Sequence, residues 1–184
     1  MKARERENNV AFSMYSASLP ALKSMLANLS QCLHKAQLHA QAKKFDPAIL
    51  LNARLYPDMF ALTRQVQVAT DQALSAAARL AGQEPPKLAN SETTIEQLQR
   101  RIETTIAYLD AVQPQQLEGS EERTIVVRIV GQYYEFTGRE FLVNEVLPNF
   151  YFHVTAAYAI LRHNGVELGK PDFLGGIVMR NQAA

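Results

Sequence analysis

The sequence of 184 residues is short of cysteine and has no excess of charge of either sign. Cys32 is the only cysteine, so no disulfide can form within the chain, which fits the reducing cytoplasm. Nineteen basic residues stand against eighteen acidic ones, and the net charge is +1. This balance lacks the strong positive field that drives non-specific binding to nucleic acid. We therefore predict a cytoplasmic location and no nucleic-acid partner.

Long apolar runs and familiar catalytic motifs are also missing. The most apolar stretch, residues 141–161, contains Asn144, Glu145, Asn149 and His153, whose polar groups would be costly in lipid. No membrane association is predicted. The sequence has no glycine-rich phosphate loop, CxxC pair, HExxH helix or nucleophile elbow. Nothing in it positively indicates catalysis.

Helical periodicity is the dominant feature that is present. Apolar residues recur at spacings of three and four over residues 19–40, from about residue 57 to Gly82, and over residues 95–112. The third of these segments follows a capping box made by Thr93 and Glu96. The pattern predicts three long amphipathic helices, each with one face buried.

The pattern changes to alternation after the third helix. Residues 124–130 and 133–136 are rich in β-branched and aromatic residues, with Gly131 between them, which predicts a β-hairpin. A fourth helix is predicted from Thr137 to Gly165, opened by a capping box of Thr137 and Glu140 and bent where Pro148 interrupts it. The fold class is therefore all-α: a four-helix bundle with a β-hairpin inserted before the last long helix.

Length and composition favour one domain. The chain is 47% hydrophobic and 20% charged, which is ordinary for a globular protein of this size. We assign residues 14–176 to the helical bundle, residues 1–13 to a flexible N-terminal tail and residues 177–184 to a C-terminal tail. The charged first segment leaves both Met1 and Met14 open as the natural start.

The fourth helix carries the first candidate site. Asn149 and His153 are four residues apart on its inward stripe, so both side chains project into the same space between helices. Such a pair can hold a metal ion or a small ligand. The alternative is structural, because a single histidine on an apolar face is more often a hydrogen-bonded core residue. The residues alone leave both interpretations open.

Further candidates lie on and before the second helix. Thr70 faces its apolar arc and Gln67 lies on the edge of that arc, so both are candidates for lining a ligand pocket. Asp71 lies further round and is a third candidate metal ligand beside Asn149 and His153. Arg54, in the preceding loop, can bind an anion or cap a neighbouring helix.

Three segments resemble a known family. They are FSMYSASLPALKSMLANL, DPAILLNARLYPDMFALTRQVQVATDQA and LPNFYFHVTAAYAILRHNGVELGKPDFLG, and the resemblance as a whole extends over about residues 14–175. They are similar to domain-of-unknown-function family 1993, a branch of the DinB-like superfamily. The resemblance implies a DinB-like four-helix bundle, often dimeric, and it supplies no established activity.

The resemblance also bears on metal binding. Metal-binding members of the superfamily typically use three histidines, one on the second helix and a pair at i and i+4 on the fourth. His153 matches the second member of that pair, Asn149 stands at the first, and the second helix has no histidine. The three-histidine site therefore cannot be assembled here in the usual way.

Three functional hypotheses follow. The first is a non-enzymatic or ligand-binding homodimer with a degenerate metal site and no cofactor. The alternative is a transferase or hydrolase that depends on a divalent metal, such as nickel, zinc or iron, held by His153 and Asn149. A third hypothesis is an interaction protein that pairs subunits through the hairpin and the aromatic face of Tyr151 and Tyr158. The first and third hypotheses are compatible.

Overall fold

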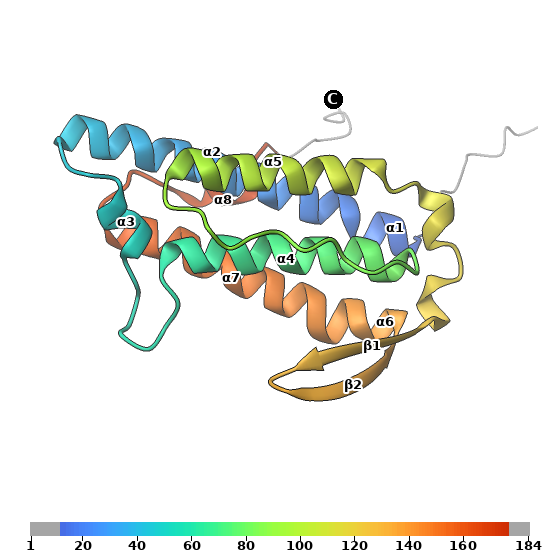
Figure 1. The fold of residues 1–184 in the computed structure, drawn as a ribbon. Helices are drawn as coiled ribbons and strands as arrows, with labels where there is room; N and C mark the ends of the chain where they lie inside the picture. The colour runs from blue at the N-terminus through green and yellow to red at the C-terminus, as the bar shows by residue number, and fades with distance from the viewer. Residues whose placement is uncertain (1–11, 177–184) are drawn as a thin grey trace, which may run out of the picture.

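Four long helices pack side by side in a computed structural model that describes residues 12–176 (Figure 1). They are α2 (Leu19–Lys43), α4 (Leu62–Leu80), α5 (Ile95–Ala111) and α7 (Leu147–His163). Helix α4 packs against α5 and α7, and α2 packs against the same two helices from the opposite side. The predicted all-α bundle is thereby confirmed. No helix among the described residues is long and apolar enough to cross a membrane.

Short elements connect and close the bundle. They are α1 (Met14–Ala17), α3 (Ala48–Asn52), η1 (Pro114–Leu117), η2 (Ser120–Glu122), α6 (Gly138–Glu140), η3 (Phe141–Val146) and α8 (Lys170–Leu174). Helix α8 packs against α2 and lies beyond Gly165, where the last predicted helix ends. Its Phe173 meets Tyr158 edge-on at 5.6 Å, so the chain itself covers a tyrosine that was expected to face solvent or a partner. The predicted tails lie outside the described residues, except for residues 12 and 13, where Ser13 caps α1.

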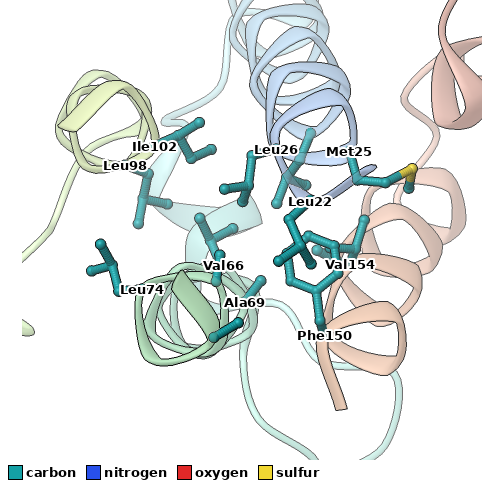
Figure 2. Packing of buried hydrophobic residues seen from close by; sticks show 14 of the residues in the cluster. Leu22, Met25, Leu26, Val66, Ala69, Leu74, Leu98, Ile102, Phe150 and Val154 are labelled. Carbon is teal, nitrogen blue, oxygen red and sulfur yellow. The ribbon is translucent and has the colours of Figure 1, made fainter. Parts of the chain in front are cut away.

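The core lies between the four long helices. Figure 2 shows Leu22 and Leu26 of α2 beside Val66 of α4 and Phe150 of α7, all of them at 0% exposure. The predicted stripe of α2 is buried in full, because helical residues three and four apart share one face. Its members are Leu19, Leu22, Leu26, Leu29, Leu33, Ala36 and Ala40.

Helix α4 begins later than the sequence predicts. Its first helical residue is Leu62, and residues 53–61 form a loop that closes on itself. The backbone N–H of Leu62 donates to the carbonyl oxygen of Ala53 at 3.0 Å. Arg54 adds a hydrogen bond from Nη1 to the carbonyl oxygen of Met59. The predicted start near residue 57 is therefore wrong, because these hydrogen bonds within the segment hold it as a loop.

The hairpin matches the prediction closely. Strands β1 (Thr124–Ile129) and β2 (Gln132–Thr137) pair antiparallel. Val130 and Gly131 form the turn with φ angles of 47° and 86°, the pattern of a turn that suits the twist of two-stranded ribbons. Ile125 is buried, so one face of the ribbon adds to the core while the other faces outward.

The last helix is continuous from α6 through η3 to α7. The capping box predicted at its start is present, with Thr137 accepting from the backbone of Glu140. Pro148 has no N–H to donate, and its ring crowds the carbonyl of Asn144. The structure accommodates this with the wider π-helical turn of η3 directly before the proline. This local widening replaces an ordinary α-helical turn at the point where a bend is predicted.

Candidate functional site

His153 lies on the buried face of α7 and contacts the first turn of α4. It is 8% exposed, and its Nδ1 atom lies 2.6 Å from Oε1 of Gln65. The amide of Gln65 donates from Nε2 to the carbonyl oxygen of Phe60 at 3.1 Å, so its Oε1 is the acceptor toward His153. The imidazole therefore carries a proton on Nδ1, and its Nε2 atom keeps a lone pair.

Two aromatic rings enclose this imidazole. Phe60 stacks on it with centroids 6.3 Å apart, and Phe152 meets it edge-on at 5.2 Å. Burial lowers the pKa of His153, and the positive charge of Arg64 lowers that pKa further. The imidazole is thus uncharged at neutral pH. Its Nε2 atom makes no hydrogen bond to any residue in the described range 12–176.

Asn149 belongs to a different cluster. Its Nδ2 atom donates to Oε1 of Glu145 at 3.1 Å, and Gln72 on α4 donates to the same oxygen at 3.2 Å. Asn149 is half-buried, whereas His153 is buried. The two side chains predicted to act as a pair therefore have different hydrogen-bond partners.

Asp71, the third candidate metal ligand, is engaged with arginine. Arg101 of α5 is 4% exposed and its Nη2 atom contacts the carboxylate of Asp71. The same guanidinium lies 2.9 Å from Oε1 of Glu92 and donates from Nε to Oγ1 of Thr70 at 2.6 Å. Asp71 is thus drawn toward α5, and its ion-pair partners among residues 12–176 are Arg101 and Arg64. Between residues 12 and 176, no three histidine, cysteine, aspartate or glutamate side chains cluster closely enough to hold a metal ion.

Helix α3 lies at one end of the bundle (Figure 1). A cleft of about 520 Å³ is lined by residues of α3, of the loop that follows it and of α4. Arg54, Phe60, Arg64, Gln67 and Glu92 are among its lining residues, and we call it the arginine cleft. Its volume lies within the range of about 300–1,000 Å³ that is typical of small-molecule sites. Two of the predicted pocket residues, Arg54 and Gln67, therefore line one cavity.

Asn149 and His153 do not line this cleft, and neither does the remaining predicted pocket residue, Thr70. Its Oγ1 atom donates to the carbonyl oxygen of Gln67 at 2.7 Å. The amide of Gln67 donates from Nε2 to Oε2 of Glu92 at 2.8 Å and accepts at Oε1 from Arg64 at 3.3 Å. Hydrogen bonds from Arg101 and Gln67 help to lower the pKa of Glu92, although its burial acts in the opposite direction. The wall of the cleft is thus a fixed polar network.

Gln65 and Arg101 are the two central residues that sequence reasoning misses. Gln65 follows the buried Leu62 by three residues and precedes the buried Ala69 by four, and Arg101 follows the buried Leu98 by three. These spacings place both polar residues on apolar helix faces. A long polar side chain at such a position is the signal that could have identified them.

Acidification should destabilise the protein through His153. The imidazole binds a proton more readily in the unfolded chain, where its pKa is near the usual value of about 6.5. Its lower folded pKa therefore contributes stability above pH 6.5, and this contribution is lost as the pH falls through the folded pKa. Urea unfolding between pH 8 and pH 5 should show a smaller decrease for His153→Gln. The exposed His34 supplies the control His34→Gln, which should keep the wild-type pH dependence; equal slopes for all three proteins would refute the argument.

The arrangement of α2, α4, α5 and α7 is that of a helical bundle of the DinB-like class. The chain belongs to the family described as domain of unknown function (DUF1993), which matches residues 14–174. A solved structure described as a DinB family member protein from Shewanella denitrificans is 41% identical, with a TM-score of 0.83. The similarity covers 93% of this chain and 96% of that one. No curated protein matches the chain.

Proposed function

We propose that this protein is a ligand-binding bundle without catalytic activity, and that its ligand occupies the arginine cleft. The observation that carries the proposal is the convergence of Arg54, Arg64 and Gln67 on one cavity of ligand size. The residues that are fixed by hydrogen bonds form its wall, and Phe60 supplies an apolar surface that is 48% exposed. Phe60 also connects the cleft with His153 through their stacked rings.

Metal-dependent transfer or hydrolysis is the second candidate function. One observation favours it: the Nε2 atom of His153 carries a lone pair and has no hydrogen-bond partner among the described residues. A neutral imidazole nitrogen of this kind can bind nickel, zinc or iron. Asn149 would have to join it through its Oδ1 atom, because its Nδ2 atom donates to Glu145.

We also propose a cytoplasmic homodimer. The absence of an internal disulfide supports the compartment. The outward face of the hairpin supports the dimer, because Val130 is 98% exposed and Tyr133 is 76% exposed. Sedimentation equilibrium tests the assembly, and a monomer at all concentrations would remove this part of the proposal.

Thermal unfolding in the presence of probes from several chemical classes tests the function. Suitable probes are phosphate, benzoate, glucose, spermidine and the chlorides of nickel, zinc and iron(II). At a concentration 100 times its Kd, a bound ligand stabilises the folded state by about 2.7 kcal/mol and raises the Tm. We expect a non-metal class to do so, and Asn52→Trp to abolish the effect by filling the cleft that Asn52 lines.

Two comparisons make the result decisive. Gln31→Trp places the same ring on an exposed position of α2 and should leave the Tm increase intact. An increase that occurs only with a metal ion and disappears in His153→Ala would favour the metal-dependent alternative. The absence of any shift with every class of probe would refute ligand binding in the cleft.

A further inference from the structure

We propose that the arginine cleft selects a small organic anion that carries a planar aromatic ring, such as an aromatic carboxylate or phosphate. This inference rests on the proposed function and names the chemical class of its ligand. It depends on two features of the cleft: a positive charge that the protein does not neutralise, and an exposed ring beside that charge.

The first feature follows from the pairing of charges. Arg101, which is 4% exposed, already binds both nearby carboxylates, those of Asp71 and Glu92. A buried arginine with two carboxylate partners neutralises most of their field. Arg64 lies 4.0 Å from Asp71, whose closer contact is with Arg101. Arg54 donates to a backbone carbonyl oxygen and has no carboxylate partner within salt-bridge distance in the described part of the chain.

The charges around the cleft therefore leave an excess of positive charge. Three guanidinium groups, Arg54, Arg64 and Arg101, face two carboxylates, Asp71 and Glu92, and the sum is +1. The two arginines at the cleft surface retain N–H groups in the forked geometry that matches carboxylate and phosphate oxygens. A ligand with one carboxylate or phosphate group would neutralise this excess positive charge.

The second feature is the placement of Phe60. Its ring lines the same cleft and is 48% exposed. The guanidinium carbon of Arg64 lies 5.8 Å from the centroid of this ring, so charge and aromatic surface are adjacent. A planar ring bound through its anionic group to Arg64 can thus pack on Phe60, since offset and edge-on ring pairs are favourable. A saturated or purely inorganic anion would lack this contact.

Titration calorimetry with four probes tests the inference. Phenyl phosphate and benzoate are the expected ligands, while cyclohexanecarboxylate lacks the aromatic ring and benzamide lacks the charge. We expect each of Arg54→Gln and Arg64→Gln to weaken benzoate binding about tenfold, as for loss of a charge-assisted hydrogen bond. Phe60→Leu should reduce the preference for benzoate over cyclohexanecarboxylate about threefold and leave the preference for benzoate over benzamide intact.

The control is Arg100→Gln, which removes an exposed arginine of α5 that does not line the cleft. It should bind all four probes like the wild type. Equal affinity for benzoate and benzamide, or benzoate binding unaffected by both cleft arginines, would overturn the inference. If glucose or spermidine binds in the cleft while the anions do not, ligand binding survives and the anion class is wrong. If no probe of any class binds, the proposed function itself fails.

Discussion

Replacing Gly138 with alanine should destabilise the protein by on the order of 3 kcal/mol. Gly138 begins α6 directly after the hairpin, and an added Cβ atom would lie 1.8 Å from the carbonyl oxygen of Ser120. Ser120 is 0% exposed, so its backbone cannot move aside without disturbing η2. Alanine in a helix would by itself gain up to about 1 kcal/mol over glycine. The clash with a backbone atom outweighs that gain, so the substitution is expected to be destabilising.

Urea unfolding measures the change, and Gly176→Ala is the matched control. A Cβ atom at Gly176 meets nothing within 4 Å, so this substitution should alter the free energy of unfolding little. We expect the midpoint of Gly138→Ala to fall while that of Gly176→Ala stays near the wild type. A Gly138→Ala protein as stable as the wild type would mean that α6 does not pack closely on η2.

Local patterns predict most of the fold. The stripe of α2, the hairpin turn at Gly131 and the capping box at Thr137 depend only on residues a few positions apart, and the structure contains all three. The start of α4 depends instead on contacts across a loop. The sequence of residues 57–61 does not by itself exclude a helix. The hydrogen bonds of Arg54 and Leu62 within the loop are what keep this segment non-helical. The hydrogen bonds that close this loop therefore override helix propensity there.

The candidate site could be predicted only in part. The inward direction of His153 follows from helical periodicity, and its burial agrees with it. Its partner Gln65 lies 88 positions away in the sequence, and no local rule connects two positions on different helices. The prediction of Asp71 as a candidate metal ligand likewise omits Arg101, which approaches Asp71 from α5. Hydrogen-bond networks between helices depend on packing register, which a single sequence does not reveal.

Replacing Arg101 with methionine should cost about 3–5 kcal/mol of stability. Its side chain is 2% exposed and binds Asp71, Glu92 and Thr70, so its loss leaves two carboxylates without their main partner. Methionine fills much of the same volume, and the expected cost therefore arises from charge and not from a cavity. Urea unfolding at pH 7 gives the difference. The control Arg100→Met removes an exposed charge one position away and should change the stability by less than about 1 kcal/mol.

The stability of Arg101→Met at low pH, and with its carboxylate partners neutralised, separates the cost of unpaired charges from the cost of lost packing. Paired with Arg101, Glu92 has a lowered pKa, so its contribution to wild-type stability is lost as the pH falls through that value. Without the arginine, burial raises the pKa of Glu92, and protonation then relieves the unpaired charge. The difference in the free energy of unfolding between wild type and Arg101→Met should therefore decrease from pH 7 to pH 4. Adding Glu92→Gln and Asp71→Asn to Arg101→Met should restore part of the stability at pH 7. A difference that is constant with pH, with no gain from the added substitutions, would show that Arg101 acts through packing alone.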